Sequence, residues 1–306
     1  MKYYTNKARQ AGMTLIELTV VLLVLIGLAG LMIPYVSGFV AKTHDSTGTW
    51  NGAALDSNMQ RYLTEKMRFP NRMEALINVA AGSATATDAT CVSAAIDTPF
   101  CKLMAPGFFD TTTADTATAG TPAAMVANSL AAAGITDIYY NDPDTDNATF
   151  ASVAPASLTT LNDASPHVLA TVGATPSTTI TTVQDHLAQA FERPVDTFDA
   201  TCYDYVVFGI GDQSELIGAT MNTAPVHFAQ QGAMGPANKY NRFVAVFQVD
   251  KNPAVVPGVV GTNKGCTAGM EPAKFVGTAM AMGSMAGHLW GTSHSLAHTW
   301  ENIAAN

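Results

Sequence analysis

AGMTLIELTVVLLVLIGLAGLMIPYV, residues 11–36, is the stretch that decides the architecture of this chain. Residues 18–41 carry no formally charged side chain. As a helix with a rise of about 1.5 Å per residue, this run is about 36 Å long, which exceeds the hydrocarbon core of a bilayer at about 30 Å. The sequence therefore predicts a transmembrane helix, and it places one carboxylate, Glu17, directly before the uncharged run.

The residues in front of this run set its orientation. Lys2, Lys7 and Arg9 precede it, and residues 1–12 contain no acidic side chain. Basic residues next to a membrane span favour the cytoplasmic side. We expect the amino terminus to lie in the cytoplasm and the chain after about residue 42 to lie outside the membrane.

Two ordinary interpretations of the apolar run are a cleaved signal peptide and a plain membrane anchor. A signal peptide has a shorter apolar region, of about 7–15 residues, that ends at an A-x-A-like cleavage site. The small residues near 37–41 make only a fair site of that kind. Neither interpretation accounts for Glu17 or for the string GMTLIE at residues 12–17.

This string resembles the processing site of type IV prepilins and of the related type II secretion pseudopilins, and the similarity extends over about residues 7–45. The resemblance implies that a membrane-embedded prepilin peptidase cleaves between Gly12 and Met13 and methylates the new amino terminus. Glu17 then corresponds to the glutamate at the fifth mature position of that family. Pro34 corresponds to the helix-loosening proline of many type IV pilins.

Cleavage would give Glu17 a physical role. An ionised carboxylate in lipid costs at least a few kcal/mol unless it is paired. The new α-amino group of Met13 is positive, and a filament of staggered helices brings Met13 of one subunit near Glu17 of another. We expect this pair to set the register of assembly. Gly27, Gly30 and Pro34 predict either local melting of the helix in the filament or ordinary close packing between helices.

The composition narrows the class of protein. Of the 306 residues, 48% are hydrophobic and only 13% are charged, against about 25% in an average domain. Such low charge suits a chain that packs against lipid or against copies of itself. The formal net charge is −9, and the basic side chains of the leader make the remainder more acidic still. General binding to nucleic acid is therefore not expected.

The cysteines indicate an oxidising compartment. Cys91, Cys101, Cys202 and Cys266 form no CxxC motif, which argues against zinc, thioredoxin-like and haem sites. An even count beyond an export signal predicts two disulfides. We favour Cys91–Cys101 and Cys202–Cys266, because each pair stays within one region of the chain. The other pairings and four buried thiols are the alternatives.

The predicted organisation has three parts. Residues 1–12 are a cytoplasmic leader, residues 13–67 a long helix whose membrane span covers about 18–41, and residues 68–306 an extracytoplasmic head. Leu55, Met59, Tyr62, Leu63 and Met67 recur at helical spacing, and Phe69-Pro70 ends the helix. We expect an α+β, pilin-like fold in which this helix packs against an antiparallel sheet.

Within the head, the patterns predict several shorter elements. Strands are expected in 202–211 and 242–250, which are rich in β-branched and aromatic residues. Helices are expected in 123–136 and 181–192 and near the carboxyl end, and Asn71 is expected to cap a helix over 72–80. Residues 110–124, rich in Thr and Ala, are expected to form a surface loop.

Two clusters suggest metal binding. Asp142, Asp144 and Asp146 alternate as at the start of a calcium loop, but Asn147 and Val153 occupy the positions where an EF-hand needs Gly and Glu. A looser calcium site, as in some pseudopilins, and an Asx-rich turn are the two interpretations. A second candidate set lies near the carboxyl end, where a transition-metal site competes with ordinary surface or capping roles: His294, His298 and Glu301.

The sequence thus predicts a structural subunit of a type IV pilus-type filament rather than an enzyme, with no cofactor except for the candidate calcium. No nucleophile elbow, phosphate loop or dinucleotide fingerprint is present in the sequence. The resemblance implies as partners further copies of the chain, other pilins, the prepilin peptidase and an inner-membrane assembly platform. It implies a single-pass inner-membrane precursor and a periplasmic or extracellular filament, in adhesion, motility or DNA uptake. A type II secretion pseudopilin or minor tip pilin is the first alternative. A membrane-anchored binding module or hydrolase is the second.

Overall fold

The computed structural model describes residues 15–78, 109–141, 155–165, 167–173, 181–225, 243–251, 266, 270–280 and 290–291. The chain forms two compact units, Met1–Thr43 and His44–Asn306. The longest element is the helix α1 (Leu15–Lys66), which is continuous through Gly27, Gly30 and Pro34. The structure does not show the helix melted at these residues, so the melting that we expect in the filament stays a prediction.

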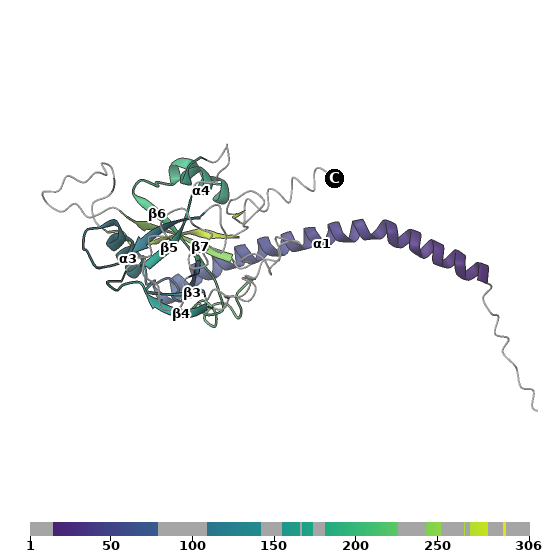
Figure 1. Cartoon of the computed structure of the whole chain (residues 1–306), viewed down its shortest axis with the longest axis horizontal. Helices are drawn as coiled ribbons and strands as arrows, with labels where there is room; N and C mark the ends of the chain where they lie inside the picture. Colours follow the sequence, from purple (N-terminus) through teal and green to yellow (C-terminus); the bar gives the residue numbers. More distant parts are fainter. Residues whose placement is uncertain are drawn as a thin grey trace, which may run out of the picture. The chain divides into compact units, whose positions relative to one another are not determined.

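In the described part of the second unit, which carries the labels of Figure 1, there are a sheet and two further helices. The helices are α3 (Pro122–Ala132) and α4 (Val183–Phe191), and a short 3-10 turn, η1 (Val195–Thr197), follows α4. The described strands are β1 (Met73–Asn78), β2 (Phe109–Ala114), β3 (Asp137–Asn141), β4 (Pro155–Thr160), β5 (His167–Val172), β6 (Tyr203–Gly209), β7 (Phe243–Asp250), β8 (Lys274–Met280) and β9 (Trp290–Gly291).

The sheet is mixed, which corrects the prediction of an antiparallel head. Its main path runs β4-β3-β1-β6-β7-β8-β9, and β5 joins β2 to β6. β1 and β3 pair in parallel, whereas the other neighbouring strands pair antiparallel. A parallel pair needs a crossover connection. The chain between β1 and β3 provides one and includes α3. The coarser prediction, an α+β fold, is compatible with this arrangement.

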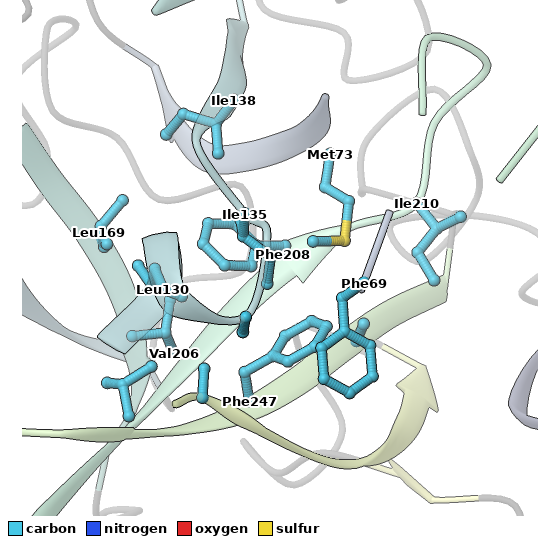
Figure 2. Packing of buried hydrophobic residues seen from close by; sticks show 14 of the residues in the cluster. Phe69, Met73, Leu130, Ile135, Ile138, Leu169, Val206, Phe208, Ile210 and Phe247 are labelled. Carbon is cyan, nitrogen blue, oxygen red and sulfur yellow. The ribbon is translucent and has the colours of Figure 1, made fainter. Parts of the chain in front are cut away.

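One face of the sheet packs against α1 and α3. Val206 and Phe208 of β6 belong to a buried cluster that also holds Leu55 and Met59 of α1 and Leu130 of α3. Figure 2 shows part of this cluster, in which the ring of Phe247 meets that of Phe69 edge to face, with centroids 5.2 Å apart. Val206 and Phe208 lie on the same face of the sheet because side chains alternate along β6 with a period of two. The segment of α1 around residues 55–62 is thus part of the core.

The other face packs against α4. Tyr205 and Val207, which alternate with the residues above, belong to a second buried cluster with Leu187 and Ala190 of α4. Burial on both faces explains why β6 and β7 read as nearly continuous apolar runs rather than as alternating ones. The sheet is therefore the middle layer, as Figure 1 indicates for α3 and α4.

The helix α1 ends where the sequence predicts, but Met67, the residue that follows it, does not continue the buried stripe. Met67 adopts a positive φ of 57° and its N–H donates to the Leu63 carbonyl at 2.8 Å. Its side chain is 85% exposed, so the expectation that Met67 lies on the buried stripe is wrong. A left-handed residue turns the chain out of the helix, and the side chain leaves the buried face with it.

Several local predictions are confirmed and others are wrong. The structure confirms α3, α4, β6 and β7 close to the predicted limits. Residues 73–78 form the strand β1 instead of a helix, and residues 110–114 belong to β2 instead of a loop. In both cases pairing across the sheet overrides local propensity. The structure describes only Trp290–Gly291 near the carboxyl end, where they form the short strand β9, so the helix expected in that region stays a prediction.

Candidate functional site

The first candidate surface is the apolar part of α1, Leu15–Met32. It is long and apolar enough to cross a membrane, and a signal sequence would satisfy the same criteria of length and composition. Its large apolar side chains are exposed on every side, with Leu15, Leu23 and Leu31 more than 70% exposed. A helix that is apolar all round is covered by lipid or by other protein. This segment therefore needs a partner or a bilayer.

Glu17 lies in the first turn of α1. There its carboxylate is favoured by the positive end of the helix dipole. One turn further, the Thr19 hydroxyl lies 2.9 Å from the carbonyl oxygens of both Leu15 and Ile16 and donates to this backbone. The processing residues, Gly12 and Met13, lie outside the described part of the chain.

A second group of polar residues fixes the carboxyl end of α1 to the head. Glu215 Oε2 accepts hydrogen bonds from Arg68 Nη1 at 2.6 Å, from the Tyr62 hydroxyl at 2.9 Å and from the Asn71 backbone N–H at 3.1 Å. Burial alone would raise the pKa of Glu215, but these hydrogen bonds outweigh it and hold the pKa below its ordinary value of 4.5. Burial and the neighbouring Glu215 carboxylate raise the pKa of Tyr62 to about 12.

Asn71 completes this junction and replaces the helix cap predicted for it. Its Oδ1 accepts from the backbone N–H groups of Thr136, at 3.0 Å, and Asp137, at 2.7 Å. Its Nδ2 donates to the Thr136 hydroxyl and to Asp137 Oδ2 at 2.8 and 2.9 Å. The amide thus joins the end of α1 to the start of β3. This saturated network is structural, and it leaves no polar atom of Asn71 for catalysis.

A hollow of about 220 Å³ lies between α1, β8 and the end of α4. It is lined by Asp56, Gln60, Phe191, Arg193, Phe275, Val276 and Gly277. Asp56 Oδ1 accepts from the Thr278 backbone N–H at 2.8 Å, and Arg193 Nη2 donates to the Val276 carbonyl at 3.1 Å. Burial raises the pKa of Asp56, although the hydrogen bonds from Thr278 and the charge of Arg193 oppose the shift.

A wider hollow of about 660 Å³ lies beside the start of α4, and Thr182, Gln184, Asp185, Val195, Asp196 and Phe198 line it. The Thr182 oxygen accepts from the Asp185 backbone N–H at 3.1 Å, and its hydroxyl donates to Asp185 Oδ2 at 2.7 Å. These groups form a helix cap. The Thr182 hydroxyl and the Asp185 carboxylate are thus engaged in the cap, and we assign no catalytic role to either hollow.

The Cys202–Cys266 disulfide expected from the sequence is present, with Cα atoms 5.5 Å apart. Cys202 directly precedes β6, and its carbonyl accepts from the Lys251 backbone N–H at 3.2 Å. The bridge therefore ties the segment in front of β8 to the centre of the sheet. The other predicted pair, Cys91 and Cys101, lies outside the described residues.

The predicted metal ligands are likewise not described. Asp142, Asp144 and Asp146, and the carboxyl-terminal set around His294 and His298, lie outside the described ranges. Within those ranges, no group of three or more His, Cys, Asp or Glu side chains is arranged to hold a metal ion. Calcium binding stays a prediction.

Sequence reasoning missed the residues that the fold brings together from distant segments. Glu215 is 147 residues from its partner Arg68, and Arg193 reaches the hollow beside Asp56 from beyond α4. A one-dimensional pattern contains no signal for such contacts. The one available clue is composition, since charged residues are rare here and each one that remains needs a partner or a function. The chain matches no protein-family model, no curated protein and no solved structure.

Proposed function

We propose that this chain is a structural subunit of a type IV pilus-type filament, made as a precursor and assembled through α1. The observation that carries the proposal is the apolar segment Leu15–Met32, which is exposed on all sides and begins with Glu17 in its first turn. The string GMTLIE in front of it matches the processing site of prepilins. The pilin-like character of the fold belongs to the same proposal.

The mechanism is an exchange of lipid for protein around α1. In the bilayer, the carboxylate of Glu17 is expensive to keep ionised. In a filament, the methylated amino group of Met13 from a neighbouring subunit supplies a positive charge close to it. The attraction between two opposite charges is strong at low dielectric, and it offsets the cost of removing both from water when they meet closely. The pair therefore favours assembly and selects one axial register.

The substitution Glu17→Val in the full-length chain tests whether the charge of Glu17 is needed for assembly. We expect normal insertion into the membrane, because the substitution makes the span more apolar, and loss of at least nine tenths of the filaments. The readouts are carbonate-resistant membrane association and electron microscopy of sheared filaments. Thr19→Val is the matched control, because it also replaces a polar side chain near the start of α1 and leaves Glu17 intact.

The results distinguish a filament subunit from a chain in which α1 is only a membrane anchor. Filaments in normal number from Glu17→Val would contradict the filament mechanism. Loss of filaments from Thr19→Val as well would show that Glu17 has no special role. The abundance of the chain in purified filaments then distinguishes a major pilin from a minor tip pilin or a pseudopilin, because only a major pilin dominates the polymer.

A further inference from the structure

Trp50 is a large aromatic side chain of the second unit that lies exposed on the surface. It lies on α1 and is 76% exposed. Ala54 and Ser57, which follow it on the same face of the helix, are short and exposed. The indole therefore projects above its surroundings. Tryptophan is normally well buried, and at protein surfaces it is enriched where another molecule covers it.

The hollow beside Asp56 offers what an indole ring needs. Its volume of about 220 Å³ suits one aromatic side chain and is below the about 300–1,000 Å³ typical of ligand pockets. Among the described residues, Asp56 accepts hydrogen bonds from Thr278 alone, so its carboxylate retains acceptor capacity. The guanidinium of Arg193 donates one hydrogen bond, to the Val276 carbonyl, and its carbon lies 6.0 Å from the centre of the Phe191 ring.

We propose that Trp50 of one copy of the chain inserts into this hollow on a neighbouring copy. The indole N–H donates to the Asp56 carboxylate, and the guanidinium of Arg193 lies against the ring face, where a cation is attracted by the aromatic quadrupole. Phe191 and Phe275 supply the apolar part of a lining that is mostly polar. The inference rests on the proposed filament function and adds a contact between heads to the contact between amino-terminal helices.

The position of the two features on α1 determines what such a contact builds. Six residues separate Trp50 from Asp56, which is about 9 Å along the axis and about 1.7 turns, so the two side chains leave the helix on different faces. Trp50 therefore does not fill the hollow of its own chain, in agreement with its exposure. We take the contact to be heterologous, as a filament requires, so that it continues from copy to copy rather than closing a reciprocal two-fold dimer.

Engineered disulfides test this contact in the full-length chain. Ala54→Cys, one turn from Trp50 on the same exposed face, is combined with Gln60→Cys at the rim of the hollow, so that the indole itself is retained. Residues 54 and 60 are about 9 Å apart along α1, beyond the about 7 Å limit for a disulfide, so any bridge joins two chains. After mild oxidation in the cells that make the chain, we expect a ladder of dimers, trimers and larger species on non-reducing gels.

Each result of the cross-linking either supports or overturns the proposed contact between heads. A ladder that needs both cysteines supports the contact. Dimers alone, or no more cross-linking than either single variant or the pair of Ala54→Cys with Asn128→Cys on the exposed side of α3, overturns it. Wild-type filaments without a ladder would remove this inference and leave the proposed function standing, whereas a wild-type chain that never polymerises would remove both.

A second variant measures the effect on assembly. Trp50→Ala is expected to leave the melting temperature of the monomer unchanged, because the side chain is exposed, and to reduce the amount of filament at least tenfold. Met67→Ala is the control, since Met67 is an equally exposed apolar residue at the other end of the same helical segment. Equal filament yields from Trp50→Ala and the wild type would overturn the inference.

Discussion

At the scale of single residues, two glutamates near opposite ends of α1 have different roles. Glu17 lies in the first turn of an exposed apolar helix, and we propose that its charge directs assembly. Glu215 lies at the end of α1 and holds Tyr62, Arg68 and the Asn71 backbone together, so its charge matters for stability. In this proposal the same chemical group serves assembly at one end of the helix and folding at the other.

Glu215→Gln tests the stabilising role. We expect it to lower the free energy of unfolding at pH 7 by about 1–2 kcal/mol, a value reduced because Arg68 is partly exposed. The folded-state pKa of Glu215 is depressed, so its contribution is present above the ordinary value of 4.5 and is lost as the pH falls through the folded-state pKa. Urea unfolding at pH 7 and at pH 3 measures both effects.

The decisive quantity is the difference in the free energy of unfolding between the wild type and Glu215→Gln. The gap between the two proteins should narrow as the pH falls below 4.5 toward the folded-state pKa of Glu215, because protonation of the carboxylate then accompanies unfolding. Glu65→Gln is the matched control, since Glu65 forms an exposed pair with Arg61 on the same helix, and such pairs contribute little. A gap between wild type and Glu215→Gln that stays constant from pH 7 to pH 3 would show that the charge of Glu215 is not the stabilising factor.

At the scale of the elements, the end of α1 is held by tertiary contacts against the preference of its residues. Met67 has a positive φ, which costs an ordinary residue about 1 kcal/mol relative to glycine. Met67→Gly should therefore raise the free energy of unfolding by about 0.5–1 kcal/mol. The exposed side chain contributes little packing that could be lost.

Lys66→Gly is the control for this prediction. It places glycine one residue earlier, at the last residue of α1, where the backbone is helical and glycine only adds conformational freedom to the unfolded chain. Chemical unfolding should thus show opposite signs for two neighbouring glycine substitutions. Destabilisation by both would mean that the left-handed conformation of Met67 is not strained.

Some helices and strands could be predicted from the sequence, and others could not. α4 could be predicted because Thr182 caps its start, Pro194 follows its end and its apolar residues repeat at helical spacing. β1 could not, because MEALIN consists largely of good helix formers. It is a strand because β3 and β6 pair with it on both sides. Pairing partners that lie far away in the sequence leave no local pattern.

At the scale of the whole molecule, the sequence predicted the features that depend on composition and missed those that depend on topology. The long amino-terminal helix, the α+β character of the head and the Cys202–Cys266 bridge follow from runs and counts. The parallel pairing of β1 with β3 follows from a crossover that no pattern revealed. The hollow between Asp56 and Arg193 was missed for the same reason.

The amino terminus of the mature chain is the most direct test of the account, because processing between Gly12 and Met13 precedes every later step of assembly. Filaments or membranes are purified from the cells that make the chain, and the terminal peptide is identified by mass spectrometry. The account predicts a chain that begins with N-methylated Met13 and retains the apolar segment Leu15–Met32. A mature chain that begins near Lys42, without that segment, would contradict it.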